Sequence, residues 1–456
     1  MAEEPTRTVD QSVLSIWQDE LKTTGDATLK QQCLQREPEL LPQFAEHYKK
    51  FKTLPRRMRR SLQRQWKQSL AGIALLLALG QGPALAATIN VNGTTCTVVN
   101  AITAANNNAA TGGCTAGLGA DTIVLPANST QTLTSVNTNY NGATGLPLIS
   151  SVITIAGNGS TIRRDPSAPD FRILAVSSIG SLTLQRTTVS GGRALAPFGG
   201  GGGVFSQGAL TLNNSTISRN SGGGVFDAFG HLSVTNSTIS GNSAGAGGGI
   251  ISYGATITNS TISGNAAKFG GGGFLNFSTA TVTNSTISEN TSSYSGGAVI
   301  NGGRGTLTLT NTTISGNTGS SGGGVSNRGT LTLNRTLISG NTATSGSAPE
   351  LDNQHTVIAN NFNLFGHDGN AGVEGFSPGP TDIVPTRSLS AILNTTLANN
   401  GGPTRTHALV GGSPAIDTVT DGACPPPARD QRGVRRPQDG NHDGAAICDT
   451  GSFERR

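Results

Sequence analysis

One seven-residue pattern recurs through the middle of the chain and constrains its fold more than any other feature. NSTISRN at 214–220 is followed by NSTISGN at 236–242 and 259–265, NSTISEN at 284–290 and NTTISGN at 311–317. Aligned on the isoleucine, and counting the copy at Ile338, the repeats follow one another at 22 to 27 residues. A repeat of this length is typical of a solenoid, in which no single unit buries its apolar face alone.

Each repeat contains two further short apolar elements. Upstream of the isoleucine, apolar residues alternate with Ser or Thr, as at Leu210 and Leu212, which indicates a strand with one apolar face. Before that strand, a glycine run ends at an apolar residue; these residues are Val204, Val225, Ile250, Phe274, Val299 and Val325. Three short strands per unit and no helical period predict a parallel β-helix. Leucine-rich repeats have a similar period, but they need a helix or a longer Leu pattern in each unit.

Two asparagines frame each heptad and are expected at the corners of the coil. Leu210 and Leu212 share one face on even numbers, whereas Ile217 resumes it on an odd number, so the chain must turn between them. Asparagine suits such a turn because it tolerates left-handed backbone angles and bonds its own main chain. We therefore predict two stacked ladders, one of Asn214, Asn236, Asn259, Asn284 and Asn311, and one of Asn220, Asn242, Asn265, Asn290, Asn317 and Asn341. In the last copy, NRTLISGN at 334–341, the first Asn is displaced by one residue, so this corner should differ.

Composition agrees with a solenoid and argues against a nucleic-acid role for it. The chain has 64 Gly in 456 residues, 12% charged residues and 4% aromatic residues, which is unlike an ordinary globular enzyme. Residues 1–87 carry 13 basic and 9 acidic side chains, and residues 88–456 carry 18 and 17. The repeat region is therefore nearly neutral and lacks the basic footprint of a nucleic-acid-binding protein.

The chain has a chemical boundary near residue 87. SLAGIALLLALGQGPALAA, residues 69–87, is an apolar stretch preceded by the basic run PRRMRRSLQRQWK. A basic flank, an apolar core and an A-x-A site are the parts of a secretory signal peptide, which predicts cleavage after Ala86. The alternative is an uncleaved signal anchor, although the strictly apolar part is short for a span of about 20 residues.

Residues 1–68 precede this signal and carry apolar side chains at helical spacings, such as Val13, Leu14 and Trp17. The pattern favours a mostly helical segment that is cytoplasmic or precedes the signal; the alternative is a start codon placed too far upstream. We expect an exported protein of the cell envelope or the medium, anchored in the inner membrane if residues 69–87 stay uncleaved.

Four of the five cysteines lie in the exported part as two local pairs. Cys96 and Cys114 are 18 residues apart, and Cys424 and Cys448 are 24 residues apart. These separations suit two small disulfide loops and not a metal site of the C-x-x-C type. Reduced, structural cysteines are the alternative.

Two regions outside the repeats resemble modules of bacterial surface proteins. CTVVNAITAANNNAATGGC and GLGADTIVLP, within 96–126, resemble the N-terminal CSLREA-type domain, although residues 97–100 depart from its namesake motif. NNGGPTRTHAL, GSPAID, DQRGVRRPQ and CDTGSFE, between 399 and 454, resemble the choice-of-anchor Q domain. The resemblance covers roughly residues 88–456 and implies a right-handed parallel β-helix of pectate-lyase-like fold. It implies no established activity, and a fold by itself does not supply one.

The expected fold is therefore all-β, a right-handed parallel β-helix with N- and C-terminal caps, preceded by a short helical segment and an apolar signal or anchor helix. The expected divisions are 1–68 for the helical segment, 69–87 for the signal, 88–150 for the CSLREA-like cap, 151–366 for the coils and 367–456 for the choice-of-anchor Q-like cap.

A polysaccharide lyase or hydrolase is the alternative that such a fold suggests. Hydrolysis needs paired carboxylates, and a lyase needs an acidic Ca²⁺-binding cluster with a basic partner. Between residues 171 and 349 the only acidic residues are Asp227 and Glu289, more than two coils apart, and His231 is the only histidine. We expect Asp227 and His231 to be solvated loop residues and assign no catalytic residue.

Binding is the favoured class because a second apolar residue follows each inward one. This stripe consists of Phe205, Phe226, Ile251, Leu275 and Ile300, and ends at Ser326. Strand alternation places it on the outer face, where an apolar row marks an interface and its Phe end could stack on sugars. The alternative is that a cap covers the row, or that it lines the core. The expected ligand is an extracellular glycan or a surface protein, as for an adhesin-like scaffold.

Two weaker patterns remain. The outward pairs Thr216/Ser218, Thr238/Ser240, Thr261/Ser263, Thr286/Ser288 and Thr313/Ser315 form a flat hydroxyl array, which makes an ice-binding solenoid a further alternative. Asp439, Asn441 and Asp443 read as the front half of a Ca²⁺ loop, but Thr450 stands where a bidentate Glu is needed. A capped turn is the alternative, and no other cofactor is expected.

Overall fold

The computed structural model describes residues 86–194, 200–346, 348–420, 424 and 426–456. The predicted segment 1–68 and nearly all of the predicted signal 69–87 lie outside these residues. Within the part of the chain that is described, no helix is long and apolar enough to cross a membrane.

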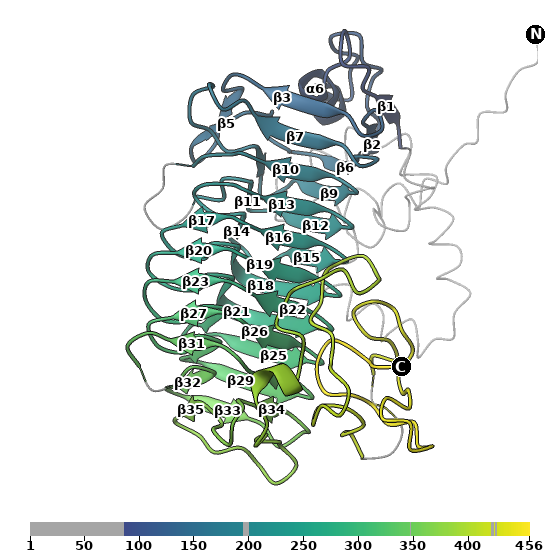
Figure 1. The fold of residues 1–456 in the computed structure, drawn as a ribbon. Helices are drawn as coiled ribbons and strands as arrows, with labels where there is room; N and C mark the ends of the chain where they lie inside the picture. Colours follow the sequence, from purple (N-terminus) through teal and green to yellow (C-terminus); the bar gives the residue numbers. More distant parts are fainter. Residues whose placement is uncertain (1–85, 195–199, 347, 421–423, 425) are drawn as a thin grey trace, which may run out of the picture. The chain divides into compact units, whose positions relative to one another are not determined.

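Parallel strands stacked coil on coil make up most of the described chain (Figure 1). The largest sheet of the described residues contains β1 (Thr88–Asn90), β2 (Ala120–Val124), β6 (Val152–Ala156), β8 (Leu174–Val176), β9 (Ser181–Gln185), β11 (Val204–Ser206), β12 (Ala209–Asn213), β14 (Val225–Asp227), β15 (Leu232–Thr235), β18 (Ile250–Thr258), β21 (Phe274–Thr283), β24 (Val299–Asn301), β25 (Thr306–Thr310), β28 (Val325–Asn327), β29 (Thr330–Asn334), β32 (Leu351–Asn353), β33 (Thr356–Ile358) and β35 (Val373–Glu374). In most coils the strand after the glycine run and the alternating strand before the heptad are separate. They belong to one sheet because β18 and β21 each extend through both of these strands.

The heptads form a second sheet. Its strands are β3 (Thr130–Leu133), β7 (Thr161–Arg164), β10 (Thr188–Ser190), β13 (Thr216–Ser218), β16 (Thr238–Ser240), β19 (Thr261–Ser263), β22 (Thr286–Ser288), β26 (Thr313–Ser315), β30 (Leu337–Ile338) and β34 (Leu364–Phe365). A smaller sheet holds β17 (Ser243–Ala244), β20 (Ala266–Ala267), β23 (Thr291–Ser292), β27 (Thr318–Gly319) and β31 (Thr342–Ala343), and β4 (Thr138–Asn139) pairs with β5 (Ala143–Thr144) as a hairpin.

The register confirms the parallel β-helix that the repeat predicts. Ile217 pairs with Ile239, which pairs with Ile262, and each of these side chains is fully buried. The degenerate copy at Val189 pairs with Ile217 as expected, and also with Ile162 on the other side. The coils therefore begin before residue 214, where the first heptad that is recognisable in the sequence starts.

The second predicted asparagine ladder is present as a hydrogen-bonded column. From Asn220 to Asn317, each side-chain Nδ2 donates to the Oδ1 of the asparagine one coil further on, for example from Asn290 to Asn317 at 2.9 Å. Each Oδ1 also accepts the backbone N–H of the preceding asparagine, as from Asn265 to Asn290 at 3.0 Å. These groups would be unsatisfied in the interior without the next coil, so the column ties each coil to its neighbour.

The first predicted ladder is correct in backbone conformation but not in side-chain bonding. Asn214, Asn236, Asn259, Asn284 and Asn311 all have φ between 46° and 50°. The bonds between coils are made instead by the following hydroxyl, since the N–H of Ser215 donates to Ser237 Oγ at 3.0 Å. In the last repeat Arg335 takes the left-handed position with φ 49°, so the predicted difference at that corner is confirmed.

A third polar column was not predicted. It follows the inward residue by two positions and contains Ser206, Asp227, Ser252, Asn276, Asn301, Asn327 and Asn353. Asn276, Asn301 and Asn327 donate to the next asparagine at 2.7 to 2.9 Å. The column could not be recognised in the sequence because its positions carry Ser, Asp or Asn and no single residue type repeats.

Helix α6 (Val98–Asn107) covers the first coils. Thr97 caps its N-terminus by accepting the N–H of Asn100, and Asn108 ends it in a left-handed conformation. Its buried face includes Ala101, Ile102 and Ala105, which join the core formed by the first strands. The predicted disulfide between Cys96 and Cys114 links the residues that flank this helix.

The segment after β35 leaves the coils and runs back along the outside of the heptad sheet (Figure 1, yellow). It contains little regular structure apart from the 3₁₀ helix η1 (Leu389–Ala391). Its apolar residues, including Ile392, Leu393 and Ile416, pack with Leu337 and Leu364 of the last coils.

Candidate functional site

The predicted apolar stripe lies outside the core, in register along five coils. Phe205 pairs with Phe226, and the row continues through Ile251 and Leu275 to Ile300. Ile251, Leu275 and Ile300 form a cluster of their own, separate from the main core, with Phe226 packed against it.

Most of this stripe is nevertheless covered. Ile251, Leu275 and Ile300 are only 6 to 7% exposed. The glycine-rich turns of the coils lie over them: a Cβ at Gly247 would come within 2.1 Å of Ile251 Cγ1, and one at Gly296 within 2.4 Å of Ile300 Cγ1. A ligand therefore has little of the stripe to contact, and its use in binding remains a prediction.

The N-terminal end of the stripe is closed by aromatic and cationic contacts. The ring of Phe205 meets that of Phe226 edge to face at 5.5 Å, and Tyr140 of the β4–β5 hairpin approaches it at 6.4 Å. The guanidinium of Arg172 lies 4.7 Å from the centre of the Phe205 ring. Burial lowers the pKa of Arg172 to about 10.

Exposed aromatic side chains occur on the coils that carry the stripe. Within the described residues, the exposed Phe and Tyr side chains all lie between 229 and 294; these are Phe229, Tyr253, Phe269, Phe277 and Tyr294. The rings of Tyr253 and Phe277 are stacked, with centres 5.1 Å apart and planes inclined by 28°. Reading the sequence by repeats missed this group, because none of the five residues belongs to the recurring heptad or to the apolar positions that precede it.

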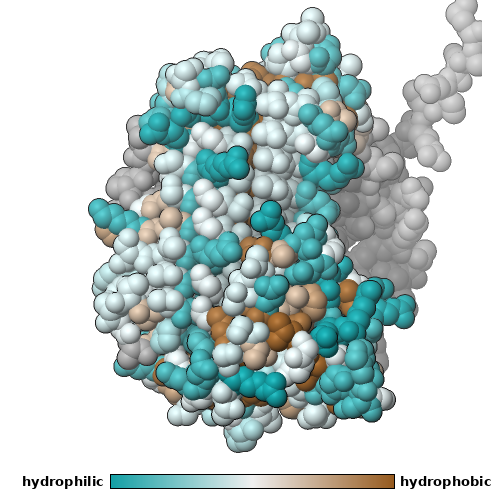
Figure 2. All heavy atoms as spheres, in the orientation of Figure 1, coloured by the Kyte–Doolittle hydropathy of each residue, from teal (hydrophilic) through white to brown (hydrophobic). Residues whose placement is uncertain are grey.

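The predicted hydroxyl array is divided between an open half and a covered half. Thr216, Ser218, Thr238 and Ser240 are partly exposed. Thr261, Thr286 and Thr313 are buried, because the C-terminal segment lies on them. Figure 2 shows that the hydrophobic residues on this side of the molecule gather over the lower coils, the region in which Figure 1 draws the C-terminal segment.

Hydrogen bonds across 119 to 171 residues of sequence attach the segment to this array. Gln431 donates from Nε2 to Thr261 Oγ1 at 3.0 Å and accepts at Oε1 from Thr286 Oγ1 at 2.7 Å. The N–H of Ser452 donates to Thr313 Oγ1 at 3.0 Å. The outward hydroxyls of these coils are therefore a docking face within the protein, and not a free flat array.

His407 is the buried histidine of this contact. Its Nδ1 lies 2.8 Å from the carbonyl oxygen of Asn394, and its Nε2 lies 2.8 Å from Ser288 Oγ. Because a carbonyl only accepts, Nδ1 carries the proton and Nε2 accepts from the Ser288 hydroxyl. Burial lowers the pKa of His407.

The motif residues that resemble the choice-of-anchor Q domain form a buried ionic network. Arg436 pairs with Glu454 at 2.7 Å, and Arg432 pairs with Asp430 at 2.7 Å. Burial raises the pKa of Glu454 to about 8 and that of Asp449 to about 7, although the charge of Arg436 opposes both shifts. Arg436 also donates to the carbonyls of Asp449 and Gly451, so these charges hold together loops that have no regular structure.

Asp227 and Glu289, the two acidic residues between 171 and 349, lie in different surroundings. Asp227 is fully buried and accepts from Ser252 Oγ at 2.7 Å and from the N–H of His231 at 3.3 Å. The expectation of a solvated Asp227 is therefore wrong, because the residue belongs to the third polar column. His231 and Glu289 are exposed, as expected for turn residues.

The predicted Ca²⁺ loop forms a compact turn. The carboxylate of Asp439 accepts the N–H groups of Asp443 and Gly444 at 3.1 and 3.0 Å, and Asn441 Oδ1 accepts the N–H of Asp443 at 2.9 Å. Within the described residues, no group of three or more His, Cys, Asp or Glu side chains could hold a metal ion. The capped turn accounts for the loop, and calcium binding stays a hypothesis.

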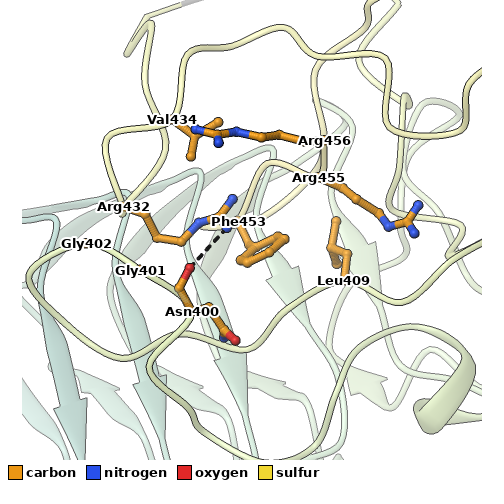
Figure 3. Close-up of a pocket in the computed structure, with 9 residues that line it drawn as sticks. All are labelled: Asn400, Gly401, Gly402, Leu409, Arg432, Val434, Phe453, Arg455 and Arg456. Carbon is orange, nitrogen blue, oxygen red and sulfur yellow. Dashed lines mark hydrogen bonds between the residues drawn. The ribbon is translucent and has the colours of Figure 1, made fainter.

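A pocket of about 410 Å³ lies within the C-terminal segment (Figure 3). It is lined by Asn400, Gly401, Gly402, Leu409, Arg432, Val434, Phe453, Arg455 and Arg456. Two of its arginines are already engaged: Arg432 binds Asp430 and lies 3.5 Å from the centre of the Phe453 ring, and Arg455 donates to the carbonyl of Gly440 at 2.8 Å. The cations of this pocket thus mainly hold the segment together.

The second predicted disulfide, between Cys424 and Cys448, is also formed. Two disulfides indicate an oxidising environment, which is consistent with export.

Comparison with known proteins bears on the fold. Among solved structures, the chain is similar to one titled "Crystal structure of pectate lyase Pel9A", with 14% identity and a TM-score of 0.39, over 74% of this chain and 88% of that chain. A likeness at this level transfers no activity. No curated protein sequence matches the chain. Residues 172–343 match the family model described as "Right handed beta helix region". This part of the chain is therefore a right-handed parallel β-helix region.

Proposed function

We propose that the protein is an exported, non-catalytic β-helix that binds an extracellular glycan or a surface protein, in the manner of an adhesin-like scaffold. The observation that carries this proposal is the group of exposed aromatic side chains between Phe229 and Tyr294, on neighbouring coils of a rigid stack. Aromatic side chains left in water on a rigid surface are costly unless a partner covers them, and they are favoured contacts for sugars and proteins.

The use of the acidic residues also supports binding over catalysis. Asp227 is held inside a polar column, and Glu350, Asp449 and Glu454 are buried in hydrogen-bonded networks. None of these carboxylates faces another across an open cleft, as a pair acting on a glycosidic bond must. A polysaccharide lyase or hydrolase of pectate-lyase-like fold remains the competing proposal.

Export and surface location rest on the predicted signal, residues 69–87, and on the two disulfides. N-terminal sequencing of the protein from fractionated host cells tests this part. An N-terminus at Ala87 in the envelope or medium supports a released protein. Retention of Met1 in the inner membrane supports an uncleaved anchor.

Binding and catalysis are separated by one pair of assays on the full-length protein. The purified protein is applied to an array of extracellular polysaccharides and host surface proteins, and every polysaccharide that is retained is then incubated with it. We expect retention without new reducing ends and without unsaturated products. Release of either product would overturn the non-catalytic proposal, and absence of retention on every surface would overturn the binding proposal.

A further inference from the structure

We propose that the protein binds an anionic polysaccharide at the column of side chains that directly follows the third polar column, with Phe277 as the stacking platform and Arg328 as the anion contact. This inference rests on the proposed binding function and names its site and ligand class. Both residues lie on the same outer face of the β-helix.

The register defines this column. The residues of the third polar column pair with one another from coil to coil. The residue that follows each of them therefore occupies an equivalent position on its coil; these residues are Gln207, Ala228, Tyr253, Phe277, Gly302, Arg328 and Gln354. The two aromatic residues are thus followed by a glycine and then by a cation.

The aromatic part of the column is preorganised. Tyr253 and Phe277 are 46% and 38% exposed, and each ring is steadied by the other at 5.1 Å. A ring that is already held in place loses little conformational freedom when a ligand stacks on it. The polar column beneath fixes the backbone, because Asn276 donates to Asn301 Oδ1 at 2.9 Å.

Gly302 leaves the next position of the column without a side chain. Gly302 is buried, and a Cβ there would lie 3.0 Å from the carbonyl oxygen of Asn276 and 3.2 Å from Phe277 Cδ1, so the Phe277 ring leans over the glycine. The backbone of Gly302 has no positive φ that would demand glycine. Coils are spaced at about 4.8 Å, so the backbones at Phe277 and Arg328 are about 10 Å apart. A polysaccharide stacked on the exposed part of the Phe277 ring can therefore pass Arg328 on the same face of the coils.

Arg328 follows Gly302 in the column. Its N–H donates to the carbonyl of Asn301 at 2.8 Å, which holds the residue beside Gly302. Its guanidinium makes one long contact, from Nη2 to Ser295 Oγ at 3.3 Å, and the side chain is exposed. Arg304, in the turn after Gly302, is also exposed. Neither arginine forms an ion pair with any residue that the structure describes, so the charge is available to a ligand.

These features select a ligand with two parts. The apolar C–H face of a sugar ring packs on a phenyl ring, and a planar guanidinium binds carboxylate or sulfate oxygens with two parallel hydrogen bonds. A neutral polysaccharide would use only the ring. An acidic one, carrying carboxylates or sulfate esters, uses both the ring and the arginine, and is the class that the column fits.

The test measures binding of the full-length protein to alginate, dextran sulfate and unmodified dextran by biolayer interferometry. The variants are Gly302→Leu, whose side chain would displace the Phe277 ring, Phe277→Ala and Arg328→Gln. Gly303→Ala and Ile179→Ala are the matched controls, because Gly303 has no φ constraint and Ile179 is an exposed apolar side chain outside the column and outside the aromatic group. The melting temperature of each protein reports its folding.

We expect binding to alginate or dextran sulfate, little binding to dextran, a loss of tenfold or more in each of the three variants, and no change in the controls. Preference for alginate would point to carboxylates, and preference for dextran sulfate to sulfate esters. If Gly302→Leu lowers the melting temperature, the test of the site rests on Arg328→Gln, because Arg328 is exposed and its replacement should not disturb folding.

Anionic binding that all three variants retain would overturn the site. Equal binding to dextran would overturn the anionic class. A protein that binds neither polyanion but is retained by another surface of the array above would overturn this inference and leave the proposed function standing. Absence of binding to every surface would overturn both.

Discussion

Asn341 donates a 2.5 Å hydrogen bond from Nδ2 to Oε2 of Glu350, where the column of asparagines runs out. The same carboxylate accepts the N–H of Gly340 at 2.8 Å. Glu350 thus stands in the place of the next asparagine and ends the ladder with a group that only accepts. It is 1% exposed.

The position of Glu350 predicts a pH dependence of stability. Burial raises the pKa of Glu350 from its ordinary 4.5 to about 7, although the bonds from Asn341 and Gly340 oppose this. The unfolded chain releases the proton near pH 4.5 and the folded one near pH 7, so stability falls as pH rises through this window. In Glu350→Gln this contribution, up to about 3 kcal/mol, should disappear.

Urea unfolding of both proteins from pH 4.5 to 8 measures this effect. Asp449 and Glu454 shift in the same direction, so the difference between wild type and variant is the quantity to compare. A constant difference across the window would show that Glu350 is ionised in the fold.

His407 predicts the opposite pH dependence in the C-terminal segment. Because burial lowers its pKa, the unfolded chain binds a proton first as pH falls through about 6.5, and docking weakens below that value. Protonated Nε2 also loses the bond from Ser288. We expect hydrogen exchange of residues 392–410 to accelerate at pH 5.5 relative to pH 7.5, after correction for intrinsic rates. In His407→Gln this acceleration should be absent, and its persistence would assign it elsewhere.

The asparagine ladder should be sensitive at its middle. Asn290→Ala removes the donor to Ile262 O and Asn317 Oδ1 and the acceptor for Asn265. Each buried partner left without a bond costs about 1–3 kcal/mol, so we expect a loss of at least about 2 kcal/mol in urea unfolding. Asn214→Gly is the control, since its φ of 48° suits glycine and its side chain is exposed. Equal losses in the two variants would contradict the ladder.

Gln431 should decide whether the C-terminal segment stays on the coils. Gln431→Leu leaves the hydroxyls of Thr261 and Thr286 without their shared partner. We expect limited proteolysis to cut the segment at least tenfold faster, while the coils remain intact. Thr238→Val on the open half of the array is the matched control. Unchanged cleavage of Gln431→Leu would mean that the apolar contacts alone hold the segment.

Arg436 should be more important than Gln431 because its loss leaves buried charge. Removing one partner of a buried ion pair costs about 3–5 kcal/mol, so Arg436→Met should release the segment and lower the melting temperature. The double variant Arg436→Met, Glu454→Leu should recover part of this loss, since the carboxylate of Glu454 is then no longer buried without its pair. A double variant as unstable as the single one would argue against an electrostatic cause.

Much of the coil could be predicted from the sequence because its contacts repeat at a fixed period. Ile217 and Ile239 are equivalent in the sequence and adjacent in space, and the left-handed angle at Asn236 follows from the turn that parity demands. The two disulfides were also readable, since each closes a short loop.

The third polar column could not be read in this way, because Ser252, Asn276 and Asp227 share a position but not a residue type. The stack of Tyr253 on Phe277 was hidden for the same reason. Register between coils, and not identity, brings such residues together.

What the sequence by itself determined is the β-helix, since each repeat pairs with its neighbour and local spacing is enough to define the partner. What only the tertiary structure decided is which outer surfaces remain open. Thr286 and Thr238 occupy the same place in motifs that differ at one residue, yet Thr286 is buried and Thr238 is partly exposed. The difference arises from contacts such as that between Thr286 and Gln431, 145 residues away. A segment without periodicity finds its place through shape and hydrogen bonding over the whole surface, and no local pattern encodes that choice.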